Sequence, residues 1–273
     1  IDGSVVMNDA VSAQAITVVA DKTAEFDAAV TATTITLAGT TGKMKVDGNV
    51  TIAGAITGGI LQTTTGASTF SGAVGTALLK TAVDADIGTT FNEAVIASTV
   101  SIKDGVTVDF DKGLTATSTT LGTSTAGGTA SFTSTAAQTV ATDLVSFGTD
   151  KKGTIVSNNT HSTGAIFSGD IGTSALSIAL ITATDDTKFT GTVFTEAMTI
   201  ANAKNVHVQG DLEIGDTDII VAGSSGDLFF DGTAEQTITG TSANSVIKGD
   251  GAGEGLLKVS NAAKVNLNVI AGI

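Results

Sequence analysis

A five-residue phrase recurs along the chain at nearly constant spacing, and it constrains the fold more than any other feature. The phrase is a bulky apolar residue, a polar residue, a small residue, any residue and then an aliphatic one. It begins at eleven positions: Phe26, Val46, Phe70, Phe91, Phe110, Phe132, Phe147, Phe167, Phe189, Val208 and Phe230. Successive starts lie about 20 residues apart on average, which is typical of proteins built from stacked structural units.

Between these phrases, apolar and polar residues alternate. Val100 and Ile102 enclose Ser101, and Val106, Val108 and Phe110 are separated by single polar residues. A period of two predicts strands of about three to six residues with one buried face, whereas a helix would repeat every three or four residues. Glycine-rich turns such as GTTGK at 39–43 lie between the strands. The sequence therefore predicts an all-β fold: a single-stranded parallel β-helix, or β-solenoid, of about 13 coils with roughly 20 residues per coil.

Stacked coils place equivalent residues directly above one another. The recurring phenylalanines are therefore expected to form one inward ladder along the rod, with Val46 and Val208 in the same slot. The glycine that follows in many copies is expected to let the backbone turn a corner. The chain contains no proline, which suits strands that must all donate backbone N–H groups to the preceding coil.

The repeat runs through the whole chain, so a single elongated domain is predicted for residues 1–273. Two segments, 74–90 and 148–166, fit the repeat poorly and are predicted to be irregular or lateral. VGTALLKTAVDA at 74–85 also allows a short capping or lateral helix. The chain opens on Ile1, which leads us to expect a removed leader or a fragment.

Charge and hydropathy narrow the classes of partner. The chain carries 27 acidic and 13 basic residues, a formal net charge of −14, and this charge repels phosphate backbones and anionic headgroups. No apolar stretch reaches the 18 or so residues of a spanning helix, so neither nucleic acid nor membrane insertion is expected. The chain has no cysteine, and this absence leaves the redox compartment open.

Paired acidic residues in turns are the candidate metal ligands. The strongest set is Asp216 and Asp218 in GDTD with Asp250 and Glu254 in GDGAGEG, since calcium binds six to eight oxygen ligands. Further pairs are Asp84 with Asp86 and Asp185 with Asp186. None completes a ligand set in sequence, and the same aspartates are explained as turn caps that keep the rod soluble. The sequence requires no cofactor and leaves calcium open.

Catalysis is not predicted. A β-solenoid that cleaves polysaccharides would use paired carboxylates or an arginine-containing cluster, together with exposed aromatic platforms, and this chain has no arginine. His161 and His207 lack a nucleophile motif nearby, and the alternation in NVHVQ places His207 on the outer, solvated face of a strand. Asn49 and Asn158 begin sequons, which leave glycan decoration open.

Three runs carry a family resemblance: FDGTAEQTITG at 230–240, VDGNVTIAGAITGG at 46–59 and VSNAAKVNLNV at 259–269. They resemble the repetitive passengers of bacterial autotransporter surface proteins, especially the rickettsial outer-membrane-protein-B type, and Thr/Ala/Gly-rich bacterial surface-layer proteins. The resemblance implies a parallel β-helix displayed outside the cell as a coat, fibre or adhesin.

These observations favour a structural extracellular protein at the cell surface: a subunit that assembles with itself, end to end or laterally, into a filament or surface layer. The alternative is a surface adhesin that binds a host or glycan ligand along one side of the rod. The segment 148–166, which holds a Lys–Lys pair, His161 and a sequon, is the predicted place for such a ligand. A polysaccharide lyase or hydrolase is the third hypothesis.

Overall fold

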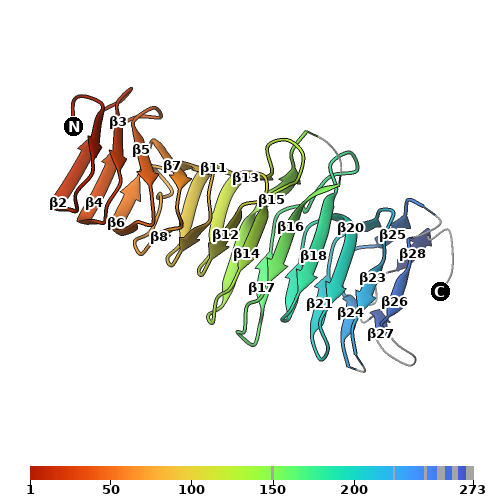
Figure 1. Ribbon diagram of the computed structural model, residues 1–273. Coiled ribbons are helices and arrows are strands. Elements are labelled where there is room, and N and C mark those ends of the chain that lie inside the picture. The colour runs from red at the N-terminus through yellow and green to blue at the C-terminus, as the bar shows by residue number, and fades with distance from the viewer. Residues whose placement is uncertain (149–150, 224, 243–244, 251–255, 260–263, 269–273) are drawn as a thin grey trace.

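The computed structural model describes residues 1–148, 151–223, 225–242, 245–250, 256–259 and 264–268. These residues form an elongated coil of parallel strands that advances from the N-terminal to the C-terminal end (Figure 1). The described residues contain no helix, so the helical alternative at 74–85 was wrong. The all-β prediction is confirmed, with about 11 turns of roughly 21 residues against the 13 coils expected.

The strands follow two hydrogen-bonded paths. The first is a 13-stranded sheet in the order β1 (Val5–Met7), β3 (Thr23–Phe26), β5 (Lys43–Asp47), β7 (Ile60–Thr65), β9 (Thr81–Ala85), β11 (Val95–Ile102), β13 (Leu114–Leu121), β15 (Gln138–Ser146), β17 (Ala165–Phe167), β19 (Thr187–Phe189), β21 (Asn205–Val208), β24 (Asp227–Phe230) and β27 (Leu256–Val259). Every pairing is parallel, because each strand pairs with the equivalent strand of the next turn.

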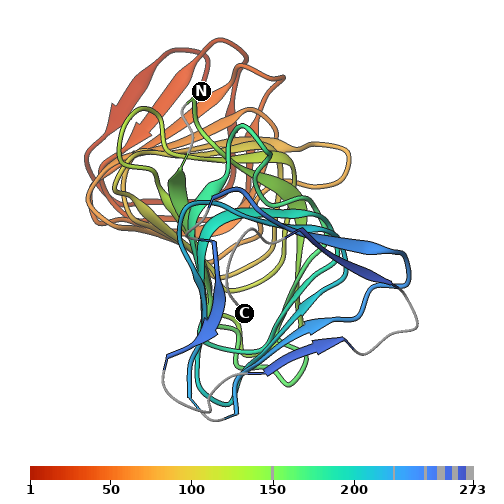
Figure 2. The ribbon, with the colours of Figure 1, turned by 90° about the vertical axis from the view of Figure 1, so that its right-hand side faces the viewer.

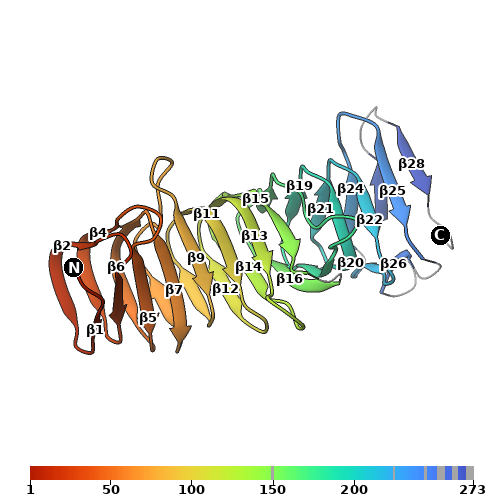
Figure 3. The same cartoon turned by 90° about the horizontal axis from the view of Figure 1, so that it is seen from above.

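The second path belongs to a 15-stranded sheet. Its order is β2 (Val11–Val18), β4 (Val30–Leu37), β6 (Thr51–Thr57), β8 (Ser68–Phe70), β10 (Thr89–Phe91), β12 (Thr107–Phe110), β14 (Thr129–Phe132), β16 (Lys152–Ser157), β18 (Ile178–Ala183), β20 (Val193–Ile200), β22 (Leu212–Ile214), β25 (Gln236–Gly240) and β28 (Val265–Asn268), with β23 (Ile219–Val221) and β26 (Ile247–Gly249) branching from β20. Figure 3 shows both sets of strands from above.

Long strands bend and divide their pairing, so each turn has three faces. β20 pairs with β22 through Val193–Thr195 and with β23 through Met198–Ile200. Figure 2 views the coil nearly along its axis, and the register defines three columns of inward residues. Column A holds Val11, Val30, Ile52, Phe70, Phe91, Phe110, Phe132, Ser157, Ala183, Ile200 and Val221. Column B holds Ile16, Ile35, Ile56, Val74, Val95, Leu114, Val140, Phe167, Phe189, Val208 and Phe230, and column C begins with Met7, Phe26, Val46, Thr63 and Ala85.

The phenylalanine rings face inward as predicted, but they do not occupy one column. Phe26 lies in column C, four rings lie in column A (Phe70, Phe91, Phe110, Phe132) and three lie in column B (Phe167, Phe189, Phe230). Within column A neighbouring rings stack with centroids 5.1 to 5.5 Å apart. Phe132 and Phe167 meet edge to face at 5.1 Å where the ladder passes from column A to column B.

Interior volume explains this transfer. Beside each column-A ring, column B has an aliphatic residue. When the ring moves to column B as Phe167 and then Phe189, column A has Ser157 and then Ala183. The close-packed interior holds one ring per turn across these two columns, and beside Phe167 and Phe189 the column-A residue is small, whereas beside Phe230 it is Val221.

Phe147 does not take an inward slot, and its assignment to the ladder was wrong. Its side chain is 47% exposed. The turn around it is enlarged, because Ser157 is the column-A partner of Phe132 and Phe167 is the column-B partner of Val140. The step from Phe132 to Phe147 is 15 residues, the shortest between successive phrases, and Phe147 has no stacked partner in the register.

Gly191 and Gly210, each the third residue of a phrase, are needed for space rather than for an unusual backbone angle. A Cβ at Gly191 would lie 2.5 Å from the Gly169 carbonyl oxygen, and a Cβ at Gly210 would lie 2.3 Å from that of Gly191. Neither position lies in the left-handed region of φ. The corners of successive turns approach so closely that only a hydrogen fits between them.

The two segments predicted to interrupt the repeat both contain strands. Segment 74–90 includes an exposed loop, 76–80, followed by β9. Segment 148–166 includes β16 and the start of β17, while residues 149–150 lie outside the described part of the chain.

The ring ladder is tested by replacing one buried and one exposed phenylalanine. Phe91→Ala should lower the free energy of unfolding by about 3–5 kcal/mol, because it leaves a cavity between Phe70 and Phe110. Phe147→Ala is the matched control and should change it little. Urea denaturation followed by far-UV circular dichroism measures both, and equal losses would contradict the ladder.

Corner stacking is tested at Gly191. Gly191→Ala should cost about 1–3 kcal/mol, since the new methyl group overlaps the Gly169 carbonyl. Gly88→Ala is the control, because its Cβ would meet only the Thr107 carbonyl oxygen at 3.8 Å, an ordinary contact. Thermal unfolding of the two variants should separate them, and an unchanged Gly191→Ala protein would refute the close approach.

Candidate functional site

The predicted calcium ligands are distributed among separate contacts. Asp216 forms an ion pair with Lys151, and Asp218 forms one with Lys248. Asp250 accepts a hydrogen bond of 3.0 Å from the Gly223 N–H. Glu254 lies outside the described residues. In the described part of the chain these side chains do not gather into a group of three acids, so calcium binding by them stays a prediction.

The other acidic pairs also contact neighbouring turns. Gln62 donates to both Asp84 and Asp86, at 3.4 and 3.1 Å. Burial, followed by the nearby Asp86 charge, raises the pKa of Asp84 above its usual value. Asp185 pairs with Lys204, and the Asp186 carboxylate accepts from a backbone N–H of the next turn. These contacts agree with a role in joining turns.

One acidic group that the sequence analysis missed does gather on the surface. Carboxylate oxygens of Glu25, Asp27 and Asp47 lie within 4.8 Å of one another. The Lys45 ammonium lies between them, 2.8 Å from Glu25 Oε1 and 3.3 Å from Asp47 Oδ2. The signal was available, because Asp27 and Asp47 are the second residues of two successive phrases. Lys45 already balances part of the charge, so the arrangement is a surface ion-pair network.

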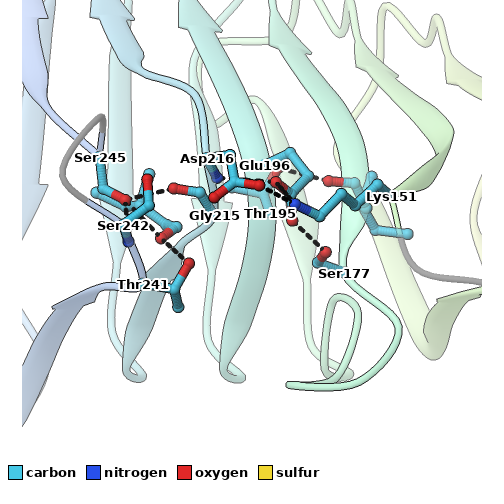
Figure 4. A network of polar contacts seen from close by, with 11 residues as sticks. Lys151, Ser177, Thr195, Glu196, Gly215, Asp216, Thr241, Ser242 and Ser245 are labelled. Atoms are coloured by element: carbon cyan, nitrogen blue, oxygen red, sulfur yellow. Dashed lines mark hydrogen bonds and ion pairs between the residues drawn. The ribbon is translucent and has the colours of Figure 1, made fainter.

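The most buried charged group forms a cluster at a corner of the coil, drawn in Figure 4. We call Lys151, Ser177, Glu196 and Asp216 the corner cluster. The Glu196 residue is 8% exposed. Its Oε1 accepts from the Ser177 hydroxyl at 2.6 Å, and its Oε2 accepts from the Asp216 N–H at 2.9 Å and lies 3.3 Å from the Lys151 ammonium nitrogen.

Four turns contribute to this corner cluster. Lys151 precedes β16, Ser177 precedes β18, Glu196 lies in β20 and Asp216 follows β22. The carboxylate fits because the residue above it is Gly215, where a Cβ would lie 2.2 Å from Glu196. A carboxylate with three donors is engaged in fastening loops of successive turns together.

The charges of the corner cluster hold one another ionised. The hydrogen bond with Asp216 raises the pKa of Lys151 above its ordinary value, and the same contact lowers the pKa of Asp216. Because the pKa of Asp216 is lower in the folded state, its carboxylate stabilises the fold at pH values above the unfolded pKa of about 3.8. This stabilisation is lost as the pH falls through the lowered pKa. Because the pKa of Lys151 is higher in the folded state, its ammonium stabilises the fold at pH values below 10.5. This stabilisation is lost as the pH rises through the raised pKa. The cluster should therefore hold across neutral pH and loosen at both extremes.

A second feature is a groove on the outer surface of the column-B face. We call it the face groove; its volume is about 370 Å³ and its lining includes Ser162, Ile166, Asp186, Lys188, His207 and Asp231. The lining residues Ile166, Lys188 and His207 are neighbours in the outward register of three successive turns, and Phe229 is the next residue in that register. Ser162 and Ile166 come from the segment 148–166 predicted to carry a ligand.

His207 lies on the outer face of its strand, as predicted, and its side chain is 35% exposed. It has more partners than a freely solvated histidine would have. Its Nδ1 lies 2.8 Å from Asp231 Oδ2, and its ring stacks on Phe229 with centroids 4.5 Å apart and planes 6° apart. The Lys258 ammonium lies 5.0 Å from the centre of the Phe229 ring. His161 instead contacts the Thr163 hydroxyl through Nδ1.

Comparison with known proteins gives no match to a family model, a curated protein or a solved structure. The repetitive β-solenoid itself agrees with the type of fold that the resemblance to bacterial surface proteins implied. Over the described residues, no helix is long and apolar enough to cross a bilayer.

The corner cluster is tested by Glu196→Gln. The amide keeps one acceptor oxygen, so either the Ser177 hydroxyl or the Asp216 N–H loses its bond to residue 196, which should cost about 1–3 kcal/mol. Exchange of the Asp216 amide proton should accelerate, because this proton is bonded to Glu196. Glu93→Gln, at an exposed position, is the control. If amide exchange by NMR is the same in both variants, the cluster does not fasten these turns.

Proposed function

We propose that this protein is a structural extracellular protein: a subunit that adds to other copies of itself, end to end, in a filament or surface layer. The observation that carries the proposal is the open edge at each end of the described coil. Among the described residues, β1 pairs only with β3 and β2 only with β4 at one end, and β26, β27 and β28 each pair on one side at the other. Unpaired strand edges are templates for another chain.

The two ends are complementary. Both present the same three faces, with strands running in the same direction, so a second copy can continue the parallel register at about 4.8 Å per turn. Both ends also leave inward apolar residues partly covered: Met7, Val11 and Ala13 at one end and Ile247 and Val265 at the other. Stacking would bury them, and a head-to-tail contact of this kind adds subunits without closing.

Charge favours end-to-end over side-by-side assembly. The net charge of −14 is spread over a chain in which only 15% of residues are charged, and parallel rods of like charge repel one another. Lateral association into sheets would therefore require added salt. The partner class that this proposal names is a second copy of the chain, at the cell surface.

Assembly is tested by removing donors from the open edge. Met7 accepts from Asp27 and Val11 donates to Ala29, so the alternate residues Val6 and Ser12 direct their N–H groups away from the coil. The double variant Val6→Pro with Ser12→Pro should abolish fibres and leave the unfolding midpoint unchanged. Val6→Thr with Ser12→Thr keeps both donors and should assemble normally.

Negative-stain microscopy and light scattering at several protein concentrations give the readout. Ordered fibres from the unaltered chain and single rods from the proline variant support the proposal. If fibres form equally well in the proline variant, the proposal that subunits add end to end through this edge is wrong.

The second candidate function is a surface adhesin that binds a host or glycan ligand. The face groove favours it, because a groove with a ring in its floor lies where the segment 148–166 meets the rod. This candidate expects dispersed short rods rather than fibres in the same experiment.

A further inference from the structure

We propose that the face groove binds a neutral saccharide, which lies with one sugar face on the His207 ring and directs its hydroxyl groups to the charged side chains around it. The inference rests on the second candidate function, adhesion, and does not depend on assembly. It names a site and a ligand class for that function.

The groove lining includes one ring, the imidazole of His207. One face of His207 is covered by Phe229, and Asp231 fixes the imidazole through Nδ1 at 2.8 Å. On the other side the next residue in register is Lys188, followed by Ile166. A ring held by a stack and a hydrogen bond loses little freedom on binding, and aromatic rings provide the apolar surface on which the C–H face of a sugar lies.

The polar groups of the groove suit hydroxyl groups. The Asp186 carboxylate uses Oδ1 to accept from the Asn205 N–H, and its second oxygen adds acceptor capacity. Lys188 lines the groove, is partly exposed and forms no hydrogen bond or ion pair with any residue that the structure describes, so its ammonium is available as a donor. Ser162 adds a hydroxyl that donates and accepts. Donors and acceptors around an apolar floor are the usual composition of a small-molecule site.

Charge argues for a neutral ligand over an acidic one. Two carboxylates, Asp186 and Asp231, face one ammonium, Lys188, in the lining of the groove. The whole chain carries a charge of −14, which further repels anions. The negative charge of the groove and of the chain would repel a sugar carboxylate or sulfate. Neutral hydroxyl groups can instead donate hydrogen bonds to Asp186 and Asp231 without electrostatic repulsion.

A second groove on the rod serves as an internal comparison. It has a volume of about 390 Å³ and is lined by Glu93, Asp111, Lys112 and hydroxyl-bearing side chains. Its acids and its single lysine match those of the face groove, but its lining contains neither an aromatic ring nor an aliphatic side chain. The ring floor is therefore the feature that distinguishes the face groove.

The test is NMR titration of the full chain with neutral hexasaccharides of glucose, mannose and N-acetylglucosamine. The chain has two histidines, so the His207 ring protons are assigned from the signals that disappear in His207→Gln. A sugar that lies on the ring should shift these protons. Lys188→Met should weaken binding about tenfold, which corresponds to about 1.4 kcal/mol. Lys112→Met, in the second groove, should leave it unchanged.

Binding of at least one neutral hexasaccharide, with this difference between the two lysine variants, supports the proposal. A carboxylated analogue of the bound sugar should bind more weakly. Absence of binding to all three sugars, equal loss in both variants, or tighter binding of the carboxylated analogue would each overturn it. Dispersed rods that bind no sugar would leave adhesion to a protein ligand standing, so failure of the saccharide proposal is distinguishable from failure of the adhesin function.

Discussion

Parallel hydrogen bonding between successive turns is the interaction on which the rest of this structure depends. Each strand is bonded to the equivalent strand one turn before and one turn after it, so the register is passed along the coil. Equivalent positions of successive turns therefore stack. Each inward residue must pack against the residues directly above and below it. This constraint explains why a chain with no proline, few aromatic residues and many threonines and valines forms an ordered rod.

Steric limits follow from this stacking. At the corner where Gly191 lies above Gly169, turns about 4.8 Å apart leave no room for a methyl group. The interior accepts one ring per turn across columns A and B, and where the ladder changes face the column-A residues are small, as at Ser157 and Ala183. Packing between faces thus decides which column a bulky residue enters.

Surface chemistry concentrates where the turns depart from regular stacking. The enlarged turn between Phe132 and Ser157 supplies Lys151 to the corner cluster, and the following segment supplies Ser162 and Ile166 to the face groove. Irregular loops have backbone and side-chain groups that are not hydrogen-bonded in the parallel ladder. These groups can therefore contact residues of several turns. The same turn provides both a fastening and a groove wall.

The sequence by itself determined the strand period, the length of a turn near 20 residues and the inward direction of most phenylalanines, because alternation and spacing are local properties that stacking preserves. It also placed His207 on an outer face. Only the tertiary structure decided that Phe147 is exposed, that the rings occupy three columns, and that Lys151 and Glu196 meet although 45 positions apart. The reason is that register between turns depends on the length of every loop and on volume across the interior. A repeat phrase gives neither the loop lengths nor the interior volume. It gives the position of a residue along the chain but not the face of the coil to which its strand belongs.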